Sequence, residues 1–238
     1  MTALVNGAGQ RVVVVTGAAS GIGAATAALF SEHGWLTAGL DLRPSATDLS
    51  EVCDVTDAAR VSDAIGAVIE RFGRVDAAVT VAGYYEEGID VCDITRAQWD
   101  SMLRVILGGT VNTCAAVLPH MIASQRGTIV AISSELALGG SATDLHYVAA
   151  KGAVLGLIKS LAAELAATPI RVNAVAPGPT DTPLLTRDSL WRKPDYLATL
   201  PLGRLVTPGE IAATVYYLAT EGRMYCGEVL SPNAGAVI

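Results

Sequence analysis

Residues 16–23 constrain the fold of this chain more than any other part of its sequence. They read Thr-Gly-Ala-Ala-Ser-Gly-Ile-Gly and lie between a β-branched run and an alanine-rich stretch with helical spacing. Three glycines at this spacing let the backbone turn sharply from a strand into a helix and approach a pyrophosphate, whose charge the helix N-terminus favours. The segment therefore predicts a strand–turn–helix unit that binds a dinucleotide.

Short apolar β-branched runs alternate with longer alanine-rich stretches along the rest of the chain. Strands are expected at residues 11–15, 36–40, 77–81, 128–132, 171–174 and 228–231, and helices at 22–33, 57–72, 96–124, 147–167 and 208–220. Strands that are apolar on both faces are typical of a parallel sheet covered on both sides. The alternation predicts one α/β domain over residues 1–238, with a doubly wound, mostly parallel sheet of the Rossmann type.

The longest irregular region, residues 177–207, is rich in proline and contains the apolar Leu184, Leu185, Leu190 and Trp191. A long loop in a compact domain is usually a lid, a binding segment or disordered chain. Because apolar side chains favour a packed segment, we expect a substrate lid around residues 179–207.

Composition excludes several function classes. The net charge of −7 disfavours binding to nucleic acid or to anionic membranes, since both need a basic face. The four cysteines and three histidines lack the spacing of metal ligands, so no metal site is expected. The uncharged residues 12–31 are interrupted by glycines and lack a basic leader, which argues against a signal peptide or membrane span. We expect a cytoplasmic protein.

An acidic residue follows the second expected strand. Asp41 lies 18 residues after Gly23, where a carboxylate can accept hydrogen bonds from the adenosine ribose hydroxyls. The same charge would repel a 2′-phosphate, and residues 18–20 hold no Arg or Lys, although Arg43 lies two residues on. The position predicts NAD rather than NADP as the cofactor.

Five motifs together resemble the short-chain dehydrogenase/reductase superfamily over nearly the whole chain. They are residues 16–23, Cys-Asp-Val-Thr-Asp at 53–57, Ile-Ser-Ser at 132–134, Tyr-Val-Ala-Ala-Lys at 147–151 and Asn-Ala-Val-Ala-Pro-Gly at 173–178. In such proteins the active serine lies thirteen positions before the tyrosine, which selects Ser134 over Ser133 here. The resemblance implies that Ser134, Tyr147 and Lys151 are the catalytic residues.

The resemblance also implies where a dinucleotide would lie. It places the adenine near Asp54 and Val55, the nicotinamide ribose at Lys151, and the nicotinamide end near residues 177–182. The complete set of expected cofactor residues is Gly17, Ser20, Gly21, Ile22, Gly23, Asp41, Asp54, Val55, Ala82, Gly83, Tyr147, Lys151, Pro177, Gly178, Thr180 and Thr182.

Elementary chemistry agrees with the catalytic roles. Tyr147 and Lys151 are four residues apart and share one face of a helix. A nearby ammonium group is expected to lower the pKa of a phenol, which then takes a proton from an alcohol or donates one to a carbonyl oxygen. The Ser134 hydroxyl can hold the substrate oxygen.

The chain departs from the family pattern at three places. The usual Asn-Ala-Gly triplet is Val81-Ala82-Gly83, and Ala150 replaces a frequent serine. Ile106 occupies the position of a fourth active-site residue, an asparagine, and an aliphatic side chain cannot hydrogen-bond a relay water. Thr110, one helical turn away, is a candidate for rebuilding that relay.

The leading hypothesis is an NAD-dependent oxidoreductase that interconverts a secondary alcohol and a ketone. The alternative is a non-catalytic dinucleotide-binding protein, which Ile106 favours; a dehalogenase is disfavoured by Lys151.

The resemblance implies a homotetramer or dimer, formed through helices 96–124 and 147–167. Candidate pocket residues for the small-molecule substrate are Tyr84, Tyr85, Leu136, His146, Leu184, Leu185 and Trp191.

Overall fold

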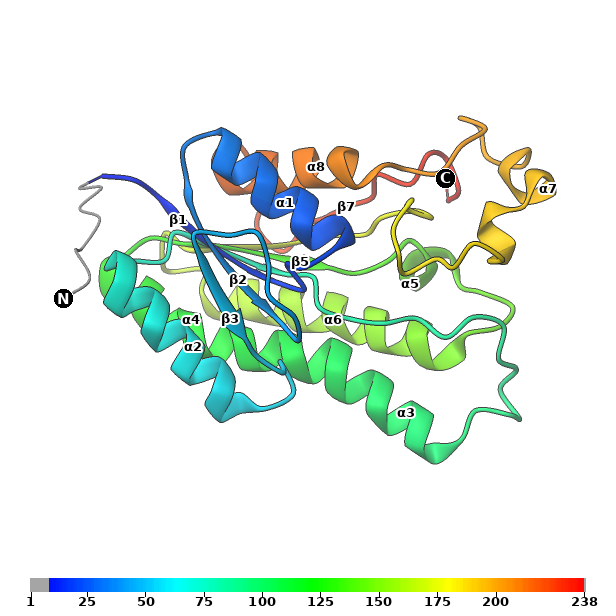
Figure 1. The fold of residues 1–238 in the computed structure, drawn as a ribbon, viewed down its shortest axis with the longest axis horizontal. Helices are drawn as coiled ribbons and strands as arrows, with labels where there is room; N and C mark the ends of the chain where they lie inside the picture. The colour runs from blue at the N-terminus through cyan, green and yellow to red at the C-terminus, as the bar shows by residue number, and fades with distance from the viewer. Residues whose placement is uncertain (1–8, 238) are drawn as a thin grey trace.

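A parallel sheet forms the centre of the molecule (Figure 1). In this computed structural model, which describes residues 9–237, seven strands lie in the order β3-β2-β1-β4-β5-β6-β7, and every neighbouring pair is parallel. Residues 1–8 and 238 of the predicted domain lie outside the described residues. The strands are β1 (Val12–Thr16), β2 (Leu36–Asp41), β3 (Leu49–Val52), β4 (Ala77–Thr80), β5 (Thr128–Ile132), β6 (Arg171–Val175) and β7 (Val229–Leu230).

Helices cover both faces of the sheet. Helices α1 (Gly21–Glu32) and α8 (Pro208–Thr220) pack together on one face, while α2 (Ala58–Phe72), α4 (Gly109–Ser124) and α6 (Leu145–Glu164) cover the other (Figure 1). Strand β1 shows the division, because Val12 and Val14 join the core beneath α2, α4 and α6, whereas Val13 and Val15 join the core beneath α1 and α8. The predicted single-domain, doubly wound Rossmann-type fold is confirmed.

The strand order reverses beside β1. Chain order runs outward from β1 through β2 to β3, and then returns to the other side of β1 at β4. In open α/β sheets a ligand binds in the crevice at the carboxyl ends of the strands where this reversal occurs. The loops after β1 and β4 therefore border the expected binding site.

Side-chain caps mark the first turns of several helices. Asp57 accepts hydrogen bonds from the amides of Ala59 and Arg60 at the start of α2. Thr207 and Glu210 form a reciprocal capping box at the start of α8. Such caps satisfy amides that have no partner within the helix, so they define where the helix begins.

The structure contains several short elements that the sequence did not predict. Strand β3 was not predicted, because it lies at the sheet edge and only alternate residues are sheltered. Residues 177–207 are not wholly irregular, since they contain a short 3₁₀ turn (Leu190–Arg192) and helix α7 (Pro194–Leu197). A further short helix, α5 (Leu136–Gly139), follows β5.

The predicted helix 96–124 is continuous but not regular. Helix α3 (Arg96–Leu103) passes through a π-helical turn (Arg104–Gly108) into α4. By length and composition alone this helix could cross a membrane, with a mean hydropathy of 1.5. A core helix meets the same criterion, and here Met102, Ile106 and Val117 are fully buried in the core between helices and sheet.

Candidate active site

In the turn between β1 and α1, Gly17 and Gly23 each have a different steric reason why no side chain fits there. Gly17 has a φ of +70°, and a Cβ atom there would lie 2.9 Å from the Ala82 amide nitrogen. A Cβ atom on Gly23 would lie 2.1 Å from the Gly17 carbonyl oxygen. The Thr16 hydroxyl accepts hydrogen bonds from the amides of Val81, at 3.1 Å, and Ala82, at 3.2 Å. The loops after β1 and β4 thus pack directly on each other.

Asp41 ends β2 beside this turn. Its carboxylate accepts hydrogen bonds from the amides of Ala19 and Arg43, each at 3.0 Å. The Arg43 guanidinium donates to the Ser20 hydroxyl at 3.4 Å. An acidic and a basic side chain therefore both stand at the outer end of the turn, with the carboxylate anchored by backbone.

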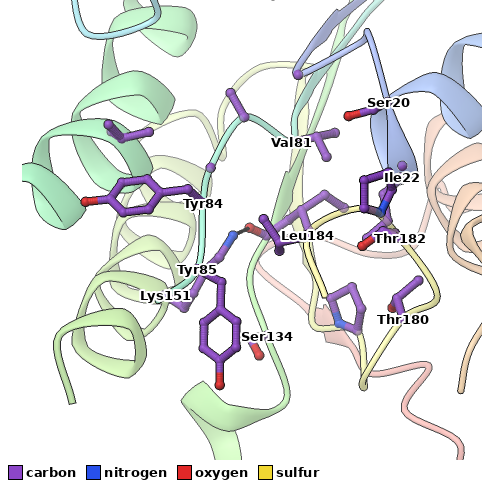
Figure 2. Close-up of a pocket in the computed structure, with 18 of the residues that line it drawn as sticks. Ser20, Ile22, Val81, Tyr84, Tyr85, Ser134, Lys151, Thr180, Thr182 and Leu184 are labelled. Atoms are coloured by element: carbon purple, nitrogen blue, oxygen red, sulfur yellow. Dashed lines mark hydrogen bonds between the residues drawn. The ribbon is translucent and has the colours of Figure 1, made fainter. Parts of the chain in front are cut away.

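One cavity of about 680 Å³ follows the carboxyl ends of the strands. Figure 2 shows side chains of the glycine turn, α6 and the segment after β6 around the same space. All predicted cofactor residues line the cavity except Gly23, which lies behind Gly17. The glycine turn fits the pyrophosphate of a dinucleotide, because it lines the cavity at the N-terminus of α1, where backbone amides and the helix dipole favour an anion. The absence of side chains at Gly17 and Gly23 lets the backbone of this turn pack closely on itself and on the loop after β4.

The three expected catalytic side chains come from two adjacent elements. Ser134 follows β5, while Tyr147 and Lys151 share one face of α6 and all three side chains are buried. The Lys151 ammonium donates to the Ile132 carbonyl at 2.8 Å and lies 5.8 Å from the centre of the Tyr147 ring. These two contacts bring the end of β5 and the first turns of α6 into one site.

The serine pair at the end of β5 has divided roles. The Ser133 hydroxyl donates to the Lys151 carbonyl at 2.9 Å and holds the strand end against α6. The Ser134 hydroxyl instead donates to the Glu135 carboxylate at 3.1 Å. Both serines border the cavity, but the hydrogen bond with Tyr147 is made by Ser134.

Burial dominates the electrostatics of this group. It raises the pKa of Tyr147, and the carboxylates of Glu135 and Asp144 raise it further, whereas a hydrogen bond with Ser134 lowers it. Burial also lowers the pKa of Lys151 to about 8. We expected the Lys151 ammonium to lower the pKa of Tyr147, and the structure does not show this. The ammonium donates to the Ile132 carbonyl, and desolvation raises the Tyr147 pKa more than the hydrogen bond with Ser134 lowers it.

The other end of the cavity is largely apolar. It is lined by Tyr84, Tyr85, Leu136, Leu184, Leu185 and Trp191, as the sequence predicts. His146 was also predicted to line it, and this was wrong. Adjacent residues of a helix point about 100° apart, so His146 turns away from the cavity and its Nε2 atom contacts the Glu86 carboxylate at 3.2 Å.

The segment predicted as a lid packs against this apolar end. Trp191 donates from its Nε1 atom to the Tyr85 hydroxyl at 2.9 Å, and the Leu190 amide donates to the Glu87 carboxylate at 2.6 Å. The Tyr85 ring meets the Tyr147 ring edge to face, with their centres 4.9 Å apart. Tyr85 therefore connects this segment to Tyr147.

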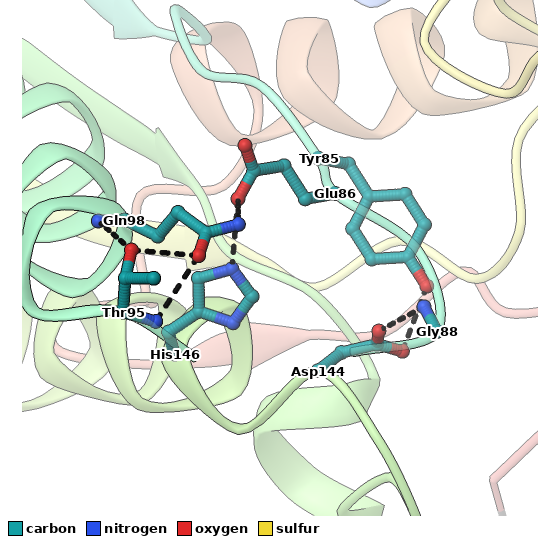
Figure 3. A network of polar contacts seen from close by, with 7 residues as sticks. All are labelled: Tyr85, Glu86, Gly88, Thr95, Gln98, Asp144 and His146. Carbon is teal, nitrogen blue, oxygen red and sulfur yellow. Dashed lines mark hydrogen bonds and ion pairs between the residues drawn. The ribbon is translucent and has the colours of Figure 1, made fainter. Parts of the chain in front are cut away.

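A polar network holds Tyr85 in place (Figure 3). Asp144 is 1% exposed and accepts hydrogen bonds from the Tyr85 hydroxyl, at 2.9 Å, and the Gly88 amide, at 2.7 Å. Glu86 contacts His146 and also accepts from the Gln98 amide group at 3.3 Å. The segment after β4 is thereby tied to α3 and to the start of α6, which positions one wall of the cavity.

Ile106 lies in the π-helical turn and is 1% exposed. Its side chain lies against Gly83, at 3.5 Å from where a Cβ atom on that glycine would be. The Thr110 hydroxyl donates to the Ile106 carbonyl at 2.8 Å and lies 3.5 Å from the Thr80 hydroxyl. Thr110 thus uses its proton within its own helix and is not directed at Lys151.

Two buried carboxyl groups of the site were not predicted from the sequence. Glu135 is 4% exposed and borders the cavity, and Asp144 anchors Tyr85. Glu135 could have been found from the sequence, because it is an acidic residue that directly follows an apolar strand and the predicted catalytic serine, Ser134. Asp144 carried no such signal, because its partners lie 56 and 59 residues away.

This combination of fold and site occurs in a known class of proteins. A family model described as enoyl-(acyl carrier protein) reductase matches residues 17–236. The chain belongs to the short-chain dehydrogenase/reductase superfamily, a family of oxidoreductases, as its motifs predict.

Individual relatives cover nearly the full length of the chain. It is 34% identical to the 3-oxoacyl-(acyl-carrier-protein) reductase FabG of Thermotoga maritima, over 96% of this chain and 98% of that protein. It is 36% identical to the cis-4-hydroxycyclohexanecarboxylate dehydrogenase of Sinomonas cyclohexanicum, over 95% of this chain and 96% of that protein. These relatives are oxidoreductases by name, and they give the non-catalytic alternative no support.

A solved structure is similar throughout. The 3-ketoacyl-(acyl-carrier-protein) reductase from Brucella melitensis, solved in complex with NADH, superposes with a TM-score of 0.89 at 27% identity. The match covers 96% of this chain and 98% of that one.

Proposed function

We propose that the protein is an NAD(H)-dependent oxidoreductase that interconverts a secondary alcohol and a ketone by hydride transfer. The observation that carries this proposal is the single cavity in which the glycine turn and Asp41 lie at one end, and Ser134, Tyr147 and Lys151 at the other. A dinucleotide-binding end joined directly to a general acid–base group is the arrangement that hydride transfer to or from a small molecule requires.

The glycine turn and the N-terminus of α1 would hold the pyrophosphate, and Asp41 would accept the ribose hydroxyls. Asp54 and Val55 border the cavity where the adenine would lie, and Lys151 would bind the nicotinamide ribose. A bound nicotinamide supplies the site that accepts or donates hydride. The relative solved with NADH supports a nicotinamide cofactor. The choice of NAD over NADP rests on the Asp41 carboxylate of this chain.

Tyr147 would act as the general acid–base. Its buried phenol keeps its proton at neutral pH, which is the state that protonates a carbonyl oxygen as hydride reaches the carbon. In the opposite direction a positive charge nearby favours the phenolate that accepts the alcohol proton. Ser134 would hold the reacting oxygen by a hydrogen bond and stabilise the charge that develops there.

The substrate would be a small molecule whose body is apolar beside its reacting carbon. The aromatic and aliphatic side chains at the lid end exclude water, which strengthens electrostatic interactions within the site. We further propose a cytoplasmic location and a function without nucleic-acid or membrane partners, in line with the net charge of −7.

The test is turnover of NADH or NAD with a panel of ketones and alcohols, followed by nicotinamide absorbance, and the key variant is Tyr147→Phe. We expect turnover to fall to the background rate while NAD still binds, because the ring still packs but the transferable proton is gone. General acid–base catalysis contributes roughly 10²–10⁴-fold. A variant that keeps the parent rate would rule out Tyr147, and a parent that binds NAD without any turnover would favour a binding protein.

A further inference from the structure

Glu135 is a buried carboxyl group that the mechanism above does not use. It is 4% exposed and lies between the main cavity and a second one of about 620 Å³ beside the lid. Its Oε2 atom accepts the hydrogen bond of the Ser134 hydroxyl at 3.1 Å. Ser134 also accepts a hydrogen bond from the Leu136 amide at 3.2 Å.

The hydrogen-bonding capacity of one serine limits what Ser134 can do. A hydroxyl has one proton to donate and two lone pairs that accept. The Leu136 amide occupies one lone pair. The hydrogen bond between Ser134 and Tyr147 is given up when Tyr147 donates to the substrate oxygen, so one proton and one lone pair then remain. If Glu135 is ionised, it can only accept, and it takes the single proton of Ser134. If Glu135 is protonated, it can donate to the remaining lone pair, and the Ser134 proton becomes free.

We propose that Glu135 is a positioning residue that sets the direction of the Ser134 hydrogen bond. When Glu135 is protonated, the Ser134 hydroxyl is free to donate to the reacting oxygen of the substrate. When Glu135 is ionised, the Ser134 hydroxyl donates to the Glu135 carboxylate instead. This inference rests on the proposed reaction, in which that oxygen gains negative charge as hydride arrives.

The surroundings of Glu135 bring this change into the neutral range. Burial raises its pKa to about 7, although the hydrogen bond from Ser134 and nearby amides oppose the rise. Its charge in turn raises the pKa of Tyr147 on α6 and of Tyr196 on α7. The other titratable groups that border the two cavities near it, or act on Tyr147, are Asp144, Lys151, Lys193 and Asp195.

A pH profile of ketone reduction tests the proposal. Glu135 is protonated below its raised pKa, so kcat should fall as the pH rises through about 7, by roughly tenfold one unit above the pKa, where about one-tenth of the carboxyl remains protonated. Glu135→Gln keeps the shape and an N–H donor but cannot ionise. We expect it to be active at pH 8 and to lack this decline.

The pH profiles of matched variants decide whether Glu135 causes the decline. Asp195→Asn removes one charge from the same second cavity and should keep the decline of the parent. A Glu135→Gln profile with the same decline as the parent would overturn the proposal. Loss of activity in Glu135→Gln to the level of Ser134→Ala, in a folded protein, would overturn it as well.

A measurement without substrate separates this inference from the proposed function. Infrared spectroscopy of the ligand-free protein should show a protonated carboxyl that titrates near pH 7 and is absent from Glu135→Gln. Because the Ser134 hydrogen bond lowers the Glu135 pKa, Ser134→Ala should raise the midpoint of that titration. An unchanged midpoint contradicts the coupling even if Glu135→Gln does not fold. Absence of turnover with every substrate would contradict only the proposed reaction.

Discussion

At the scale of one residue, the burial of Lys151 opposes the stability of the folded protein. Lys151 is 5% exposed, and its ammonium group donates to the Ile132 carbonyl at 2.8 Å. Desolvation disfavours the charged form, and the resulting pKa of about 8 lies below the ordinary lysine value of 10.5. The unfolded chain therefore binds more protons than the folded protein between these values, and stability rises with pH across that window.

Lys151→Met is predicted to raise the free energy of unfolding at pH 7 and to abolish turnover. The gain is up to about 3 kcal/mol, since one pKa unit corresponds to about 1.4 kcal/mol, and loss of the hydrogen bond to Ile132 reduces it. The gain should shrink as the pH rises from about 8 to 10.5. Urea unfolding at several pH values measures it, with exposed Lys159→Met on the same helix as the control. A less stable Lys151→Met protein at pH 7 would refute this reasoning.

Asp41 carries the cofactor prediction. The parent should bind NAD(H) at least about tenfold more tightly than NADP(H), a difference of about 1.4 kcal/mol. Asp41→Asn keeps an oxygen that accepts the Ala19 amide but removes the charge, so it should narrow the gap by improving NADP(H) binding. Fluorescence titration of both cofactors measures this, and Asp63→Asn, 73% exposed on α2, serves as the control. Equal affinities of the parent protein for NAD(H) and NADP(H) would contradict the prediction that NAD is the cofactor.

At the scale of elements, the π-helical turn between α3 and α4 places an aliphatic side chain where the family pattern has an asparagine. Such turns occur often at functional sites, because the wider ring redirects side chains. Here the turn buries Ile106 in the core against Gly83, and Thr110 satisfies the Ile106 carbonyl. At position 106 the turn therefore contributes packing, while Arg104 and Val105 of the same turn border the cavity.

Ile106→Asn is predicted to destabilise the protein by about 2–4 kcal/mol without raising turnover. An amide placed there loses apolar burial and lacks a partner among the aliphatic neighbours. Ile106→Val, the matched control, should cost about 1 kcal/mol. Thermal unfolding and steady-state turnover measure both effects. A stable Ile106→Asn variant that turns over faster than the parent would show that a polar group at this position limits the natural reaction.

At the scale of the whole molecule, apolar side chains remain exposed on the helices that the family resemblance assigns to subunit contacts. Val111 and Ile122 on α4 are 42% and 43% exposed, and Leu145 at the start of α6 is 46% exposed. We predict a dimer or tetramer by light scattering at micromolar concentration. Val111→Arg should lower the assembly state, because it places a charge on the apolar face. A monomeric parent protein would contradict this prediction.

The sequence predicted most of the fold because its determinants are local. The β-branched runs, the helical spacing and the glycine turn each act within a few residues, and their alternation predicts a doubly wound parallel sheet. Strand β3 was not predicted, because an edge strand of four residues contains too few apolar residues to be recognised in the sequence. The ordered spacing of Ser134, Tyr147 and Lys151 likewise sufficed to identify a site that the structure brings into one cavity.

Tertiary structure alone decided the electrostatics of that site. The sequence placed Lys151 near Tyr147, but only packing directs its ammonium to the Ile132 carbonyl and lets burial raise the tyrosine pKa. His146 faces Glu86 instead of the cavity, and Glu135 lies buried beside Ser134, for the same reason. The pKa and direction of a polar group depend on desolvation and on partners far apart in the chain, and no local sequence pattern encodes those distances.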